Sequence, residues 1–185
     1  MIDKTIVIGV SGGSGSGKSI FASALCRELE GAFLISSDHY FKKDLPTMIS
    51  PLDGKEYPDW NHPDSIHSER MRQDMIEAAE SGKYRYVVAE GAYLFCIEPI
   101  RAMMDLKLWV DASVEMRIFR RIARNVQSGQ TIDFVGGYYL NCVRYREKEF
   151  SLPSAGYADM TIPNEAENEY LASLPSVLER IKEIR

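Results

Sequence analysis

A glycine- and serine-rich stretch near the N-terminus holds the residue types and spacing best suited to chemistry. It fits the pattern G-x-x-x-x-G-K-[ST] at every fixed position, and its residues are Gly12, Gly13, Ser14, Gly15, Ser16, Gly17, Lys18 and Ser19. Glycines let successive backbone N–H groups point inward at phosphate oxygens, and a helix that begins near Gly17 adds the positive end of its dipole. In such a loop Lys18 reaches the β- and γ-phosphates and the Ser19 hydroxyl ligates Mg²⁺. The stretch therefore predicts a site for a nucleoside triphosphate and Mg²⁺.

The surroundings of this loop narrow the class of protein. A β-branched apolar run (5–10) precedes the loop and a segment with helical periodicity (21–29) follows it. This context favours a phosphate-binding loop over a flexible turn. The chain has no N-K-x-D motif that reads guanine and no L-S-G-G-Q motif. The pattern favours a kinase that uses ATP and acts on a small metabolite.

Acidic residues follow two of the predicted strands. Asp38 comes shortly after an apolar run, where its carboxylate could accept a proton from a substrate hydroxyl; capping a turn is the alternative. Glu90 ends another apolar run, where it could orient Mg²⁺ through water; a salt-bridged surface glutamate is the alternative. Spacing alone leaves both alternatives open.

Four arginines predict one charged helical face. Arg117, Arg120, Arg121 and Arg124 fall at i, i+3, i+4 and i+7, and adjacent like charges destabilise an isolated helix. A polyanion opposite them is therefore a reasonable inference, although a solvated face explains some of them. We expect Arg117 to bind the nucleotide, and Arg121 and Arg124 to stabilise transition-state charge from a lid that closes over ATP.

An alternation of strands and helices must position these residues. Strands are predicted at 5–10, 32–36, 86–89, 106–110 and 158–162. Helices are predicted at about 21–29, 71–81, 113–128, 134–150 and from 174. This order predicts an α/β fold, a three-layer P-loop NTPase sandwich with a five-stranded parallel sheet, helices on both faces and an arginine-rich helical lid. Ligands of such sheets bind at the carboxyl ends of the strands.

A proline-rich segment, 42–63, interrupts the alternation and is predicted to be a long irregular excursion. Because it follows Asp38, we expect it to fold over the acceptor and to present Tyr57, Asp59, Trp60 and His62. Trp60 offers a stacking face, and Asp59 could accept two hydrogen bonds from a ribose diol. The alternative is that Trp60 packs under the loop and Asp59 caps a turn.

Length and composition predict one domain over residues 1–185, with a lid at about 113–150. The net charge of -5 disfavours binding of nucleic acid or of an anionic membrane. Three widely spaced cysteines indicate reduced thiols, and neither a signal peptide nor a membrane-spanning run is apparent. We therefore expect a cytoplasmic protein whose partner is a small-molecule acceptor, and a homo-oligomer stays possible.

Several of these motifs resemble the uridine kinase family of P-loop kinases, which is related to phosphoribulokinase and nicotinamide riboside kinase. The segments similar to the family are 8–19, 38–41, 90–91, 120–124, 150–153 and 157–163. The resemblance implies an ATP:alcohol phosphotransferase in which Asp38, within a D-x-[FY]-[FY] match, is the catalytic base. Tyr40 of the same match is expected at the substrate.

Departures from the family pattern concern the acceptor. The family's F-D-H-P carries a ribose-binding aspartate, where this chain has Asn61; neighbouring Asp59 could substitute. The pyrimidine-reading segment Y-D-F-x-x-H is missing, as it is in nicotinamide riboside kinases. We expect a uridine-like nucleoside as acceptor, with nicotinamide riboside or another non-pyrimidine alcohol as the alternative. An ATP-binding regulatory module is the alternative from a different class.

Overall fold

A sheet of five parallel strands lies at the centre of the computed structural model, which describes residues 4–184. Its order is β2–β5–β1–β6–β7, and the prediction of a five-stranded parallel sheet in an α/β fold is confirmed. The strands are β1 (Ile6–Ser11), β2 (Ala32–Ser36), β5 (Tyr86–Glu90), β6 (Leu106–Asp111) and β7 (Met160–Pro163). With β1 in the middle, the glycine-rich loop that follows it begins at the centre of the sheet's carboxyl edge.

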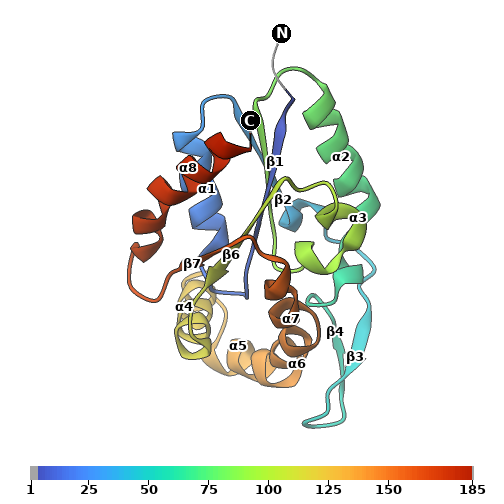
Figure 1. The fold of residues 1–185 in the computed structure, drawn as a ribbon. Coiled ribbons are helices and arrows are strands. Elements are labelled where there is room, and N and C mark those ends of the chain that lie inside the picture. The colour runs from blue at the N-terminus through green and yellow to red at the C-terminus, as the bar shows by residue number, and fades with distance from the viewer. Residues whose placement is uncertain (1–3, 185) are drawn as a thin grey trace.

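Helices cover both faces of the sheet (Figure 1). They are α1 (Lys18–Glu28), α2 (Ser68–Glu80), α3 (Glu98–Arg101), α4 (Val114–Gln127), α5 (Ile132–Tyr138), α6 (Arg144–Arg146), α7 (Leu152–Ser154) and α8 (Leu174–Glu183). Successive side chains of a strand point to opposite faces. Ile8 accordingly packs with α1 and α8, whereas Val7 packs with α2 and α3. None of the helices in residues 4–184 is long and apolar enough to cross a membrane.

The predicted helix at 134–150 is part of a longer helical stretch. Here α5, α6 and α7 are joined by π-helical turns at Tyr139–Val143 and Glu147–Ser151, so that helical backbone runs from residue 132 to 154. Such π-helical turns occur frequently at functional sites. This stretch and α4 lie at the carboxyl edge of the sheet, beside the end of β1 (Figure 1).

The prediction that 42–63 forms a long irregular excursion is wrong for the middle of the segment. The segment contains an antiparallel hairpin of β3 (Thr47–Ile49) and β4 (Glu56–Pro58). Its tip is closed by bonds from the Ser50 N–H to the Lys55 carbonyl, 2.8 Å, and from the Gly54 N–H to the Ser50 carbonyl, 2.9 Å. The prolines do not prevent pairing because they lie outside the two strands or, as Pro58, at the end of one.

Burial of α1 yields a stability prediction. Phe21 is fully buried and meets the Tyr170 ring edge-on at 6.1 Å, whereas neighbouring Ile20 is 60% exposed. Phe21→Ala should lower the free energy of unfolding by about 3–5 kcal/mol, measured by urea denaturation. Ile20→Ala is the control and should change it by less than about 1 kcal/mol. Similar losses in both variants would contradict this packing.

Candidate active site

A backbone hydrogen bond closes the glycine-rich loop, and the first N–H groups of α1 remain available as donors. The Ser16 N–H donates to the Gly13 carbonyl at 3.1 Å. Helix α1 begins at Lys18. Its N-cap residue is Gly17, which has no side chain to accept a hydrogen bond, and the first turn of the helix holds no acidic residue. The first N–H groups of a helix have no intrahelical partner, and they bind anions.

Two glycines of the loop are required by its surroundings. Gly15 and Gly17 have φ angles of +87° and +94°, a region that side-chain-bearing residues rarely adopt. A Cβ atom on Gly15 would lie 2.3 Å from the Arg117 carbonyl oxygen, and one on Gly17 would lie 2.2 Å from Nδ2 of Asn164. Asn164 also donates to the Ser16 carbonyl at 2.7 Å. Helix α4 and Asn164, which follows β7, therefore pack closely against the loop.

Lys18, Ser19 and Glu90 lie together beside this loop. The Ser19 hydroxyl donates to one carboxylate oxygen of Glu90 at 3.0 Å, and the Ser36 hydroxyl donates to the other. Glu90 is buried, so it is not a surface glutamate. Burial lowers the pKa of Lys18, and the nearby carboxylates of Glu90 and Asp38 oppose that shift.

The oxygen atoms of Ser19 and Glu90 fit Mg²⁺, which prefers oxygen ligands and is usually bound by one or two protein groups plus substrate phosphates. Among residues 4–184 there is no cluster of three or more His, Cys, Asp or Glu side chains that could hold a metal by itself. The buried Ser16 hydroxyl has no hydrogen-bond partner within the same range, so the loop retains unused hydrogen-bonding capacity. These residues suit a metal that arrives with a triphosphate.

Asp38 stands in a short 3-10 turn directly after β2. The Ser36 hydroxyl accepts from the Asp38 N–H at 3.4 Å, and the Asp38 side chain is exposed. It borders a cavity of about 230 Å³. Nine residues singled out in the sequence meet at this cavity, namely Ser14, Lys18, Ser19, Asp38, Trp60, Asn61, His62, Arg121 and Arg124.

Three residues expected at the acceptor lie elsewhere. The Tyr40 hydroxyl donates to Asp74 of α2 at 2.6 Å, and its ring packs in the apolar cluster on that face of the sheet. Asp59 is fully buried and forms an ion pair with Arg146 at 2.6 Å. Tyr57 lines a neighbouring cavity and its hydroxyl donates to Asp53. Sequence spacing cannot show these partners, because all but Asp53 are distant in the chain.

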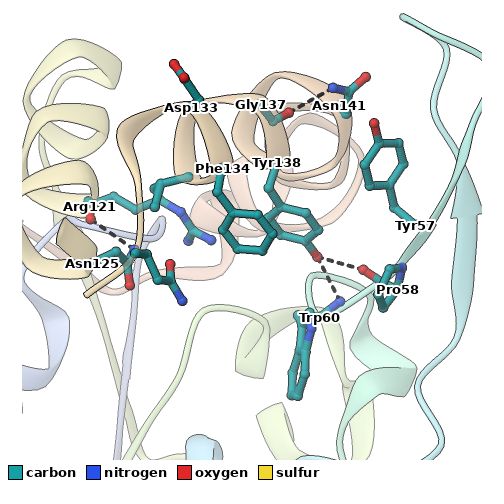
Figure 2. A pocket seen from close by; sticks show the side chains of 12 residues that line it. Tyr57, Pro58, Trp60, Arg121, Asn125, Asp133, Phe134, Gly137, Tyr138 and Asn141 are labelled. Carbon is teal, nitrogen blue, oxygen red and sulfur yellow. Dashed lines mark hydrogen bonds between the residues drawn. The ribbon is translucent and has the colours of Figure 1, made fainter. Parts of the chain in front are cut away.

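Tyr138, which no sequence motif singles out, connects α5 to the end of β4 and the residues after it. Its hydroxyl donates to the Pro58 carbonyl at 2.8 Å and accepts from the Trp60 N–H at 3.2 Å (Figure 2). It also accepts from Asn61 Nδ2 at 3.1 Å. A phenol has one proton, so Asn61 must turn its amide nitrogen toward Tyr138. The side-chain oxygen of Asn61, a residue that lines the cavity, is thereby turned away from Tyr138.

The arginine face of α4 divides into two pairs, and one pair supports the fold. Arg117 is 4% exposed and donates to Glu147 at 2.7 Å. Arg120 donates to the backbone carbonyls of Asn164 at 2.7 Å and Glu165 at 3.0 Å. The expectation that Arg117 binds the nucleotide therefore does not match its position, because Arg117 is buried and its Nη1 is paired with Glu147.

The other two arginines line the cavity. Arg121 donates to the Ser14 hydroxyl at 2.6 Å, while its buried Nε–H finds no acceptor within residues 4–184. Burial and the neighbouring charge of Arg124 lower the pKa of Arg121. Arg124 is exposed at the cavity wall. A buried N–H without a partner is costly, so an anion beside Arg121 would stabilise this arrangement.

Glu147 is a further residue that the sequence did not reveal. It is 2% exposed, lies in the second π-helical turn, and accepts from Arg117 and from the Ser14 N–H at 2.9 Å. Removing one partner of a buried ion pair leaves an uncompensated charge. Glu147→Gln should therefore lower the free energy of unfolding by about 3 kcal/mol in urea denaturation.

Two controls accompany this prediction. The double variant Arg117→Met/Glu147→Leu removes both charges and should lose less stability than the single variant. Arg180→Ala breaks an exposed pair with Glu183, and should cost less than about 1 kcal/mol. A Glu147→Gln protein as stable as the Arg180→Ala protein would contradict the role given to the buried pair.

The parallel sheet, the glycine-rich loop and the basic residues around one cavity define a P-loop phosphotransferase. The family described as "Phosphoribulokinase / Uridine kinase family" matches residues 53–170, and the chain belongs to this family. It is an ATP-dependent small-molecule kinase.

Similar proteins span nearly the whole chain. A uridine kinase of Macrococcus caseolyticus (strain JCSC5402) is 31% identical over 193 residues, which cover 90% of this chain and 92% of that protein. A uridine kinase of Clostridium tetani (strain Massachusetts / E88) is 28% identical, covering 91% of both.

Two solved structures show the same fold at low sequence identity. TT1252 from Thermus thermophilus has a TM-score of 0.61 and 21% identity, covering 97% of this chain and 99% of that chain. Shikimate kinase from Acinetobacter baumannii, in complex with shikimate, has a TM-score of 0.57 and 17% identity, covering 98% and 96%.

Proposed function

We propose that this protein transfers the γ-phosphate of ATP to a hydroxyl group of a uridine-like nucleoside. The observation that carries the proposal is the single cavity at which Lys18, Asp38 and two arginines meet. The names of the similar uridine kinases support uridine as first candidate. The whole chain, 1–185, would act as one kinase domain, with 42–63 on the acceptor side and 113–150 as the lid.

The phosphate side of the reaction would use the glycine-rich loop. Residues 12–19 would surround the phosphates with backbone N–H groups, and Lys18 would bind the β- and γ-oxygens. Ser19 would hold Mg²⁺ directly and Glu90 would orient it through water; when bound, the metal neutralises phosphate charge. The bond between Ser19 and Glu90 supports this assignment.

Asp38 would act as the base. Its carboxylate is exposed at the cavity and is close enough to Lys18 to influence the pKa of that amine. It would accept the proton of the acceptor hydroxyl while the hydroxyl oxygen attacks the γ-phosphorus and ADP leaves. Arg121 and Arg124 would stabilise charge on the transferred group, and Arg117 would keep the loop and α4 together.

The acceptor would lie against Trp60, Asn61 and His62. The Asn61 carbonyl oxygen, free because of Tyr138, would accept a hydrogen bond from a hydroxyl of the acceptor. Nicotinamide riboside remains the second candidate, because the chain passes directly from α2 to β5 without the pyrimidine-reading segment. Three cysteines without disulfides and the use of ATP support a cytoplasmic location.

A screen for ADP release tests the proposal as a whole. Uridine, cytidine, nicotinamide riboside and simple sugars would be added to the protein with ATP and Mg²⁺. Release that depends strongly on an acceptor supports the kinase. Slow ATP hydrolysis that no acceptor stimulates would instead indicate a regulatory ATP-binding module.

The role of Asp38 gives a separate prediction. Asp38→Asn keeps the shape of the side chain and removes its basicity, so uridine-dependent ADP release should fall about a hundredfold or more. ATP binding, measured by calorimetry, should persist. Asp44→Asn changes an exposed carboxylate nearby and serves as the control. Loss of ATP affinity in Asp38→Asn would mean that Asp38 serves the nucleotide and is not the base.

Metal dependence is the next prediction. EDTA should abolish ADP release, and Ser19→Ala should raise the Mg²⁺ concentration for half-maximal rate by about tenfold or more. Ser23→Ala, one turn further along α1, is the control. It should leave the required Mg²⁺ concentration unchanged, because the Ser23 hydroxyl donates to the backbone carbonyl of Ser19 and not to the metal site. Full activity in EDTA would refute the metal assignment.

A further inference from the structure

Ser14 of the glycine-rich loop contacts two parts of the lid. Its N–H donates to Glu147 of the second π-helical turn at 2.9 Å, and its hydroxyl accepts from Nη1 of Arg121 on α4 at 2.6 Å. Glu147 is held in turn by Arg117, another residue of α4, at 2.7 Å. A buried carboxylate therefore fixes the backbone of Ser14, while its side chain holds Arg121.

The bond to Ser14 orients the guanidinium of Arg121. Within residues 4–184 this guanidinium donates to no other acceptor, and its buried Nε–H stays without a partner. An arginine side chain has many rotamers, so one that is held by a single contact loses its orientation when the contact is removed. Arg124, three residues further along α4, carries a like charge at the same cavity and repels Arg121. The hydroxyl of Ser14 thus decides where the charge of Arg121 lies.

This position brings Arg121 to the groups proposed for phosphoryl transfer. Ser14 and Arg121 line the same cavity of about 230 Å³ as Lys18 and Asp38. Charged groups that are in place before the reaction stabilise developing charge without reorganisation. An arginine that first had to find its position would lose part of this advantage.

Two roles are open to the Ser14 hydroxyl, and they predict different kinetics. A hydroxyl has one proton and two lone pairs, so it can accept from Arg121 and still donate to a phosphate oxygen. A contact made equally to bound ATP and to the transition state lowers KM without changing kcat. A contact that acts only in the transition state raises kcat.

We propose that Ser14 is a positioning residue for phosphoryl transfer, whose hydroxyl holds Arg121 at the phosphate loop before the nucleotide arrives. The inference rests on the proposed function, since it assigns to Arg121 the charge that develops on the transferred group. Glu147 contributes through the Ser14 N–H, which fixes the loop side of the contact. The preset arginine acts on the rate of transfer and not on the affinity for ATP.

Steady-state kinetics of serine variants test this role. Ser14→Ala removes the hydroxyl and keeps the N–H that donates to Glu147. The kcat for uridine-dependent ADP release should fall about tenfold, and the KM for ATP should change less than about twofold. Ser14→Thr keeps a hydroxyl and should retain most of the kcat. A higher KM for ATP with an unchanged kcat in Ser14→Ala would assign the hydroxyl to ATP binding and overturn the inference.

Ser23→Ala is the control for these measurements. Ser23 is a serine of α1 whose hydroxyl donates to the Ser19 carbonyl, away from Arg121, so its replacement should leave kcat unchanged. A fall in kcat as large as that of Ser14→Ala would overturn the inference, because the loss would not depend on the bond to Arg121.

A double variant tests whether Ser14 acts through Arg121. Arg121→Ala alone already removes the contact, so adding Ser14→Ala to it should lower kcat no further. A second fall of about tenfold in the double variant would overturn the inference, because Ser14 would then act independently of Arg121 or through the fold as a whole.

Chemical modification separates this inference from the proposed function. If no acceptor stimulates ADP release, the proposed function fails, but the contact to Arg121 can still be measured in the protein without nucleotide. Phenylglyoxal modifies accessible guanidinium groups, and peptide mass spectrometry reports each arginine separately. Ser14→Ala should raise the rate of modification at Arg121 about threefold or more, since the hydroxyl no longer holds the group, and should leave that at exposed Arg124 unchanged. Equal rates at Arg121 in the variant and the wild type would overturn the inference.

Discussion

The buried ion pair between Arg117 and Glu147 is the interaction on which the arrangement of the site depends. It joins α4 to the second π-helical turn, and through the Ser14 N–H it also joins both to the phosphate loop. An unpaired charge in this position would be costly, so these three segments stay together. Arg121 and Arg124, which follow Arg117 on α4, line the cavity.

The phosphate side of the cavity combines positive groups with carboxylates that keep them in place. Burial favours the neutral form of Lys18, and Glu90 and Asp38 favour its charged form. Arg121 is tied to Ser14 yet keeps one donor without a partner. Groups fixed before the ligand arrives need little reorganisation during reaction, which is the main source of catalysis in phosphoryl transfer.

The acceptor side is built from contacts between the lid and the hairpin segment. Tyr138 orients Asn61 and supports the backbone at Trp60, while Arg146 neutralises Asp59 beneath them. The acidic residue that could have bound a ribose diol is therefore used in the fold, and a neutral amide faces the cavity.

The sequence by itself determined the parallel sheet, the phosphate loop and the family. These features are visible because each is encoded in a short local pattern, such as the apolar run before the loop or the spacing from Gly12 to Ser19. The tertiary structure alone decided which arginines face the cavity, that Tyr40 and Asp59 are used in packing, and that Glu147 and Tyr138 support the site. Their partners lie between 30 and 133 residues away in the chain. Local spacing cannot predict such pairings, because only folding brings those residues together.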